Sequence, residues 1–312
     1  MKKMICCWFG WVGWVAALLT LCPMVESAEK TQVIFLLHDG IEVETVTGHA
    51  RQYRTLETSA VEVLLRIQNI GKPLRQTIRF CEEQRYAYLL TAASSDFVAV
   101  PMSQDRMYRN VDDTLRQLRQ PLCRGVYLHE LFAQHATDLK NWDPQEVAAA
   151  GLDWDWLERL VRGCVAAQKP IYWSDGGLSW EMFGTSPRAE AFGRRWGAWI
   201  IPLFATNFVG SFRENAQAAE GFAQQYGTRL GISVQDWHFI AAQNAGKALR
   251  EKQIDYADLG ITPASTLRLL DVGNTHRCRV FEIEGTQTGM HPESAFMQGV
   301  AQFMAAVGKV ER

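Results

Sequence analysis

The chain has 312 residues, of which 47% are apolar and 21% charged, and its formal net charge is −2. This length allows one large domain or two ordinary ones. The balanced charge, without any block of like charges, argues against nucleic acid or an anionic membrane surface as the partner.

The first 28 residues have the pattern of a secretory signal peptide. Two lysines are followed by an uncharged run over 4–24, and cleavage is expected near Ser27 or Ala28. An uncleaved membrane anchor is the alternative, because the apolar run is almost long enough to cross a bilayer. The sequence therefore predicts an exported protein, periplasmic or extracellular, with a single domain over 29–312.

Four cysteines follow the predicted leader: Cys81, Cys123, Cys164 and Cys278. Export would permit disulfides, and four cysteines allow three pairings among which sequence does not choose. Buried free thiols are at least as good an interpretation, because two of the cysteines stand at strand starts and one in a helix. Their spacing does not fit a zinc site. No metal and no cofactor are expected.

In the first part of the chain, a continuous apolar run over 31–37 predicts the first strand. The polar stretch 41–56 is expected to be a loop over the barrel mouth, and the periodicity of 56–70 predicts a helix. The stretch 74–93 is open between one long helix and a helix followed by the second strand. A short strand is predicted over 97–101 and a helix from residue 110 to about 120, with Asn or Asp as its cap.

The stretch RGVYLHELF at 124–132 predicts a buried strand over 125–130 that ends in a carboxylate. From there strands and helices alternate to the end of the chain, with Gly or Pro between them. Strands are predicted over 170–174, 199–205, 229–234 and 277–283, and helices over 153–167, 187–196, 213–226 and 292–307, with one or two more within 239–276. Such alternation favours a single (β/α)8 TIM-type barrel of the α/β class. The alternative is an open doubly wound sheet, but no glycine-rich phosphate loop follows the first strand.

Acidic residues recur where the predicted strands end. They are Glu130, Asp175, Asp236, Glu282 and Glu284. The carboxyl ends of the strands carry the active site in barrel enzymes. Because residues of one parity share a face of a strand, each acid lies on the face of the apolar residues two and four positions before it. If those faces point inward, the acids meet at the barrel mouth, whereas any one acid alone could cap a helix or pair with an arginine.

Two carboxylates across a cleft are the usual means of breaking a glycosidic bond. Glu130 is the candidate acid, because its apolar neighbours would raise its pKa and keep it protonated. Asp236 and Glu284 are the candidates for the base. Asp175 and Glu282 are held as further candidates that contact the substrate.

Aromatic and hydroxyl-binding side chains accompany these acids. Trp173, Trp180 and Trp237 could stack on a sugar ring, although packing between a helix and a strand is the alternative for each. Four further residues could bind sugar hydroxyls: Tyr127, Asn207, His38 and His238.

The order of RGVYLHELF, YWSDGG, IPLFATNF, GISVQDWHF and VFEIEG resembles (β/α)8 glycoside hydrolases, most nearly the catalytic domain of glycoside hydrolase family 98. The resemblance extends over about residues 31–305, but 41–56 and 240–276 match nothing in it. Members of that family are secreted, inverting endo-β-galactosidases with a Glu acid and an Asp–Glu pair on the base side. The resemblance thus implies Glu130 as the acid and Asp236 with Glu284 as the base.

Two other functions stay open from the sequence. A metal-dependent polysaccharide hydrolase or deacetylase could draw ligands from His38, Asp39, Asp236 and His238. A non-catalytic glycan-binding envelope protein could use the same acids and tryptophans without turnover. In each case the expected partner is an oligo- or polysaccharide, with no membrane contact beyond an N-terminal anchor, and the oligomeric state is undetermined.

Overall fold

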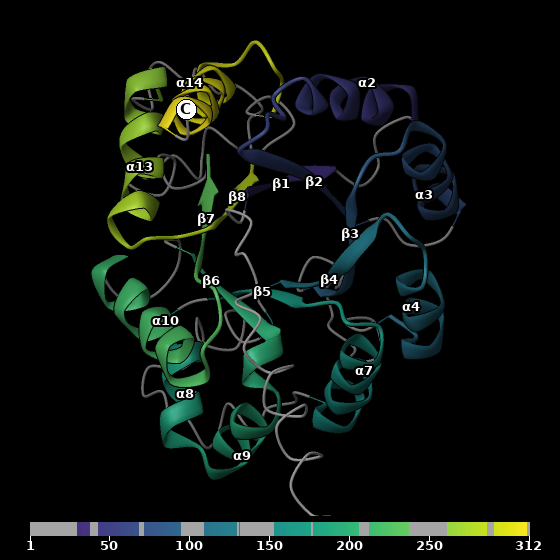
Figure 1. The fold of residues 1–312 in the computed structure, drawn as a ribbon, viewed down its shortest axis with the longest axis vertical. Helices are drawn as coiled ribbons and strands as arrows, with labels where there is room; N and C mark the ends of the chain where they lie inside the picture. Colours follow the sequence, from purple (N-terminus) through teal and green to yellow (C-terminus); the bar gives the residue numbers. More distant parts are fainter. Residues whose placement is uncertain are drawn as a thin grey trace, which may run out of the picture. The chain divides into compact units, whose positions relative to one another are not determined.

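Eight parallel strands form a closed barrel in which each strand pairs with the next and β8 pairs with β1 (Figure 1). The computed structural model describes residues 30–37, 43–68, 72–94, 109–129, 131, 153–175, 177–205, 212–236, 261–285 and 290–310. The strands are β1 (Thr31–Leu37), β2 (Val61–Ile67), β3 (Tyr88–Ser94), β4 (Cys123–His129), β5 (Ile171–Asp175), β6 (Ile200–Ala205), β7 (Gly231–Gln235) and β8 (Val280–Glu284). The predicted (β/α)8 fold is confirmed.

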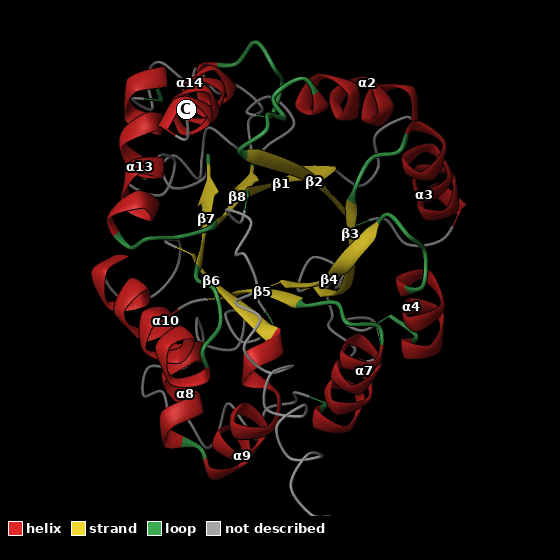
Figure 2. Ribbon diagram, viewed as in Figure 1, coloured by secondary structure: helices red, strands yellow, loops and turns green. Residues whose placement is uncertain are grey.

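Helices surround the ring of strands, as the red ribbons of Figure 2 show. They are α2 (Val43–Arg54), α3 (Lys72–Gln84), α4 (Val111–Leu118), α7 (Trp154–Ala166), α8 (Gly177–Thr185), α9 (Pro187–Trp196), α10 (Phe212–Tyr226), α13 (Pro263–Thr275) and α14 (Ala295–Val310), with a 3-10 turn at Gly197–Trp199. None of the helices within the described ranges is both long and apolar enough to cross a membrane.

Three predictions on the first third of the chain have a clear outcome. The stretch expected as a loop over 41–56 contains the helix α2, and the helix expected over 56–70 is wrong because β2 lies there. The ambiguous stretch 74–93 is a helix followed by a strand, α3 and β3. The strand expected over 97–101 lies outside the described residues.

Alternate residues of the strands face the barrel interior. A cluster that draws one or two residues from most strands, and none from the helices, fills its middle: Ile34, Leu64, Ala87, Leu89, Tyr127, Tyr172, Ile201, Leu203 and Val280. The residues of opposite parity, such as Val33, Val63 and Val126, belong instead to a large cluster shared with the helices. Burial of these two apolar layers is the main favourable contribution to folding.

Polar side chains close the amino end of the barrel. The side-chain amide of Gln32 donates through Nε2 to Glu62 at 2.8 Å, and its Oε1 accepts from the Tyr172 hydroxyl at 2.9 Å. Arg229 also reaches that oxygen at 3.3 Å, and Arg124 lies 3.3 Å from the Glu62 carboxylate. These side chains satisfy one another's hydrogen bonds and close this end of the barrel. A candidate site is therefore sought at the carboxyl end.

Four helices end in a left-handed residue just before a strand. These residues are Arg85, Gln168, Gly227 and Arg277, with φ between 54° and 66°. After each one, the next N–H returns to the last helical turn, as Thr228 does to Ala223 at 3.0 Å. This geometry turns the chain sharply from helix into strand.

Two glycines of α10 and its end give a paired test of that geometry. Gly227→Ala is expected to lower the free energy of unfolding by about 1 kcal/mol, because a Cβ disfavours the left-handed conformation. Gly221→Ala is expected to raise it by about 0.5–1 kcal/mol, because Gly221 is exposed within the helix and a Cβ there meets nothing within 4 Å. Urea denaturation of both variants checks this, and shifts of the same sign would contradict it.

Candidate active site

Polar side chains take over from apolar ones at the carboxyl end of the barrel interior. The inward positions there hold Arg66 of β2, His129 of β4, Gln235 of β7, and Glu282 and Glu284 of β8. None of the five is more than 7% exposed. Buried charges of this kind require partners, and this end of a barrel is where barrel enzymes hold their catalytic groups.

Arg66 lies at the centre of the group and is fully buried. Its NH1 donates to Glu282 Oε1 at 2.7 Å and to Glu284 Oε2 at 2.8 Å. Its NH2 donates to the side-chain oxygen of Gln68 at 3.0 Å. The guanidinium carbon lies 4.2 Å from the centre of the Tyr127 ring, a cation–π distance. One guanidinium thus joins three strands: β2, β4 and β8.

Glu284 is the least buried of the five side chains and has the most donors around it. Besides Arg66, His129 Nε2 lies 3.3 Å from its Oε2 and Gln235 Nε2 lies 3.4 Å from the same atom. An opposite charge at 2.8 Å favours the ionised carboxylate. A carboxylate that such a contact keeps ionised is suited to accept a proton.

Tyr127 underlies the group as part of the barrel's inner layer. Burial, followed by the nearby negative charge of Glu282, raises the pKa of Tyr127 well above its usual value, and Arg66 opposes this in part. The phenol is therefore protonated at neutral pH. It can serve as a neutral donor beside Glu282.

Asp236 follows β7 and is fully buried. Its backbone N–H donates to the Glu284 carbonyl oxygen at 3.2 Å. Its carboxylate packs against Gly285, where an added Cβ would lie 2.7 Å from Asp236 Cγ. Only glycine fits at position 285, so the chain brings Asp236 directly beside the residue that follows Glu284.

The expected facing of the acids is correct for β8 but wrong for the other strands. Val280 belongs to the interior cluster, and Glu282 and Glu284 share its parity. On β5 the interior residue is Tyr172, so Trp173 and Asp175 face the helices. On β4 and β7 the predicted inward residues pack with the helix layer instead; they are Val126, Leu128, Ile232 and Val234.

Trp173 and Trp180 lie in an aromatic cluster between the strands and the helices. Their ring centres are 5.7 Å apart, and Phe183 and Phe222 complete the cluster. Trp173 is 0% and Trp180 2% exposed, so the packing alternative holds for both rather than stacking on a sugar. The Trp173 indole N–H donates to Asp175 Oδ2 at 3.3 Å, which gives this buried carboxylate a structural partner.

Five predicted site residues lie outside the described residues. They are the candidate acid Glu130 and the candidate contacts His38, Asn207, Trp237 and His238. In the sequence Glu130 directly follows His129, the last residue of β4.

The sequence did not single out Arg66, Gln68, His129 or Gln235. For β2 a signal was present, since Glu62, Leu64, Arg66 and Gln68 alternate with Val61, Val63, Leu65 and Ile67. Except at Leu64, polar and apolar residues alternate over these eight positions, a pattern that indicates a strand. His129 and Gln235 are the polar last residues of β4 and β7, each directly after an apolar residue.

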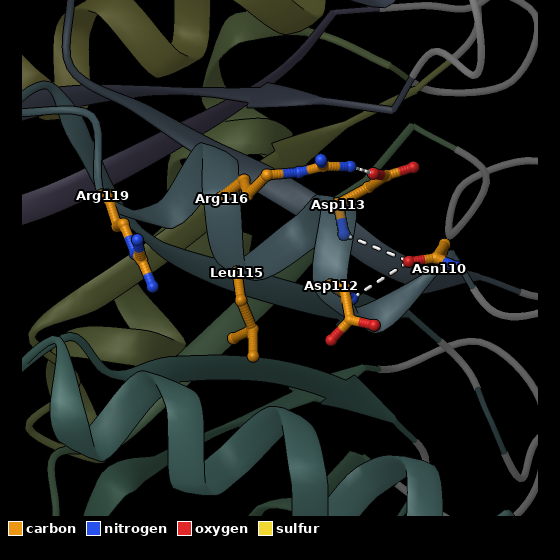
Figure 3. Close-up of a pocket in the computed structure, with 6 residues that line it drawn as sticks. All are labelled: Asn110, Asp112, Asp113, Leu115, Arg116 and Arg119. Carbon is orange, nitrogen blue, oxygen red and sulfur yellow. Dashed lines mark hydrogen bonds and ion pairs between the residues drawn. The ribbon is translucent and has the colours of Figure 1, made fainter.

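Two hollows lie away from this end of the barrel interior. One, of about 500 Å³, lies beside α4, where Asn110 caps the helix by accepting from the N–H groups of Asp112 and Asp113 and where Asp113 pairs with Arg116 (Figure 3). The other, of about 420 Å³, lies by α10 and the end of α13, where His276 contacts Glu220 at 2.7 Å. In each hollow an acid already has a partner: Arg116 for Asp113 in the first and His276 for Glu220 in the second.

No thiol or metal chemistry is apparent within the described part of the chain. Cys81, Cys123, Cys164 and Cys278 are buried and free there. Burial raises the pKa of Cys81 to about 12 and that of Cys123 to about 11. Such thiols are poor nucleophiles. In the same residues, no group of three or more His, Cys, Asp or Glu is arranged to hold a metal ion.

The comparisons with known proteins concern the fold. No family model and no curated sequence matches the chain. The fold resembles the catalytic module of a family 98 glycoside hydrolase. The solved structure of that module from Streptococcus pneumoniae with the H-disaccharide blood group antigen has a TM-score of 0.62 and 12% identity, over 90% of this chain. The complex with the Lewis Y pentasaccharide gives a TM-score of 0.57 at 11% identity, and the native form 0.55 at 10%.

The chain spans about half the length of these structures, 52% in each case. The resemblance expected from the sequence is confirmed at the level of the fold. Fold alone does not establish activity, so the chemistry has to be argued from the side chains.

Proposed function

We propose that the protein is a glycoside hydrolase that cleaves a glycosidic bond in an oligo- or polysaccharide by carboxylate acid–base catalysis with inversion. The observation that carries the proposal is Glu284, held by Arg66 at 2.8 Å at the carboxyl end of the barrel interior. A carboxylate kept ionised in this place has the properties of the base in an inverting glycosidase.

The second carboxylate in this proposal is Glu130, acting as the acid. It would donate its proton to the oxygen of the leaving sugar, while Glu284, with Asp236 beside it, draws a proton from the attacking water. His129, the residue before Glu130 in the chain, lies 3.3 Å from Glu284, so the end of β4 reaches the proposed base. No step in this scheme uses a metal ion or a cofactor.

The proposed setting is outside the cytoplasm, on the strength of the signal-peptide pattern over 1–28. The first glycans to test as substrates are those that carry the H or Lewis Y antigens, because structures of the similar modules contain these antigens. The sugar and linkage that this chain prefers are to be found by testing a broader panel.

Release of new reducing ends from such a panel tests the proposal. The wild type is expected to release them from at least one glycan at the same rate with and without a chelator. Glu130→Gln is expected to reduce the rate to background, because an amide is too weak an acid to protonate the leaving oxygen, while binding of the intact glycan is kept. Loss of activity on chelation would favour the metal-dependent alternative, and full activity of Glu130→Gln would remove the proposed acid.

A further inference from the structure

Arg66 is buried inside the barrel together with two carboxylates, an arrangement that needs a reason. Removing a guanidinium from water is costly unless several partners replace the water. Its NH1 has Glu282 at 2.7 Å and Glu284 at 2.8 Å, and its NH2 has Gln68 at 3.0 Å. Apolar residues fill the layer beneath and separate this cluster from the polar side chains at the amino end of the barrel.

We propose that Arg66 is a positioning residue which fixes the Glu284 carboxylate and keeps it ionised as the base. This inference rests on the proposed function. Arg66 itself need not touch the substrate, because it acts through the carboxylate it holds. No such role was indicated by the sequence, in which β2 looked like part of a helix.

The two glutamates have different surroundings, and this divides their roles. Glu282 is fully buried beside Tyr127, whereas Glu284 is 7% exposed and lies one inward position nearer the end of β8. Glu282 anchors the guanidinium from the inner side. The guanidinium, so anchored, presents the same nitrogen to Glu284 in a fixed direction.

The formal charges show why the arginine controls protonation. With His129 neutral, Arg66 and the two glutamates sum to −1. The groups that face them are Gln68 from β2, Tyr127 and His129 from β4, Gln235 from β7 and Asp236 beyond it. Without Arg66, two carboxylates would share a buried space with no fixed cation, and the cluster would take up a proton.

Kinetics of Arg66 variants test the inference on a glycan that the wild type cleaves. Arg66→Met is expected to lower kcat on the order of 10²-fold with KM little changed, since the loss is in the base and not in binding. The acidic limb of its pH–rate profile is expected to move up by about one pH unit or more. Arg66→Lys keeps the positive charge but lacks the planar guanidinium. Its kcat should fall about tenfold, and the acidic limb of its pH–rate profile should not move.

Arg124→Met serves as the matched control. Arg124 pairs with Glu62 at the opposite end of the barrel, so its removal should leave the pH–rate profile unchanged. If Arg66→Met keeps the wild-type kcat and acidic limb, the inference is overturned while the proposed function stands. Should Arg66→Met fail to fold, Arg66→Lys decides, and a wild-type kcat in that variant would overturn the inference.

Thermal stability gives a second reading that does not depend on activity. In Arg66→Met the buried carboxylates should have raised pKa values, so protonation favours the folded state and stability falls as pH rises. The melting temperature of Arg66→Met should therefore lie further below that of the wild type at pH 8 than at pH 5. An equal gap at both pH values would overturn the electrostatic role. A wild type that cleaves no glycan would overturn both this role and the proposed function, whatever the melting curves show.

Discussion

Replacing Glu284 by Gln is expected to lower kcat on the order of 10³-fold with KM nearly unchanged. The amide cannot accept the proton of the attacking water, and general base catalysis contributes about 10²–10⁴ to a rate. The fold should survive, because Arg66 keeps Glu282 at 2.7 Å and the formal charge of the cluster changes from −1 to 0. Steady-state kinetics and a melting curve of the same preparation measure the two effects.

Glu62→Gln is the matched control for that prediction. Glu62 is another glutamate on an inward strand position, but it lies at the amino end, where it accepts from Gln32 at 2.8 Å. Its replacement should leave kcat unchanged. Equal losses in the two variants would mean that the carboxyl end of the barrel has no special role, and full activity of Glu284→Gln would exclude Glu284 as the base.

The second large effect is expected in stability rather than in catalysis. Trp173→Ala should lower the free energy of unfolding by about 3–5 kcal/mol, the usual cost of truncating a fully buried aromatic side chain. The ring is 0% exposed between Trp180 and Phe183, and its indole N–H satisfies Asp175. The variant thus leaves both a cavity and a buried carboxylate that has lost a donor. Urea denaturation measures the change.

Trp173→Phe separates packing from substrate contact. A phenyl ring fills much of the same space, so stability should recover in large part, and KM should match that of the wild type. A small loss of stability in Trp173→Ala combined with a raised KM would contradict the packing role. It would restore Trp173 as a surface on which sugar stacks.

The barrel could be predicted because its strands after residue 123 are short apolar runs between Gly or Pro. The exception among the early strands is β2, whose inward residues Glu62 and Arg66 are charged. They pair with partners from other strands, for instance Arg66 with a glutamate 216 positions later. Local composition cannot reveal such a partner, so a strand with charged interior positions was mistaken for a helix.

The direction of the acids was harder to predict for a related reason. Strands of a parallel barrel are buried on both faces, so apolar residues occur at both parities and do not mark the inner one. On β5 the bulky Trp173 faces the helices, whereas Tyr172 and the small Ser174 share the inward face. The more informative signal is the polar residue that ends a strand, such as His129 on β4 or Gln235 on β7.

Sequence reasoning selected all three proposed catalytic acids from strand ends alone, and two of them, Glu284 and Asp236, lie within the described residues. The structure brings both to the same corner of β7 and β8, through the Asp236 N–H bond to Glu284 and the contact with Gly285. What the sequence could not supply is the charge environment. The ionised state proposed for Glu284 rests on Arg66 of β2 and His129 of β4, which are far from it in the sequence.

The most direct test of the account is the proton NMR spectrum of a cleaved glycan during the first minutes of hydrolysis. The account predicts a new reducing-end anomeric signal whose configuration is opposite to that of the broken linkage, as expected when one carboxylate activates water and another protonates the leaving group. A first product with retained configuration would contradict the proposed pair of acid and base. The absence of any new reducing end across the panel would contradict the glycoside hydrolase itself.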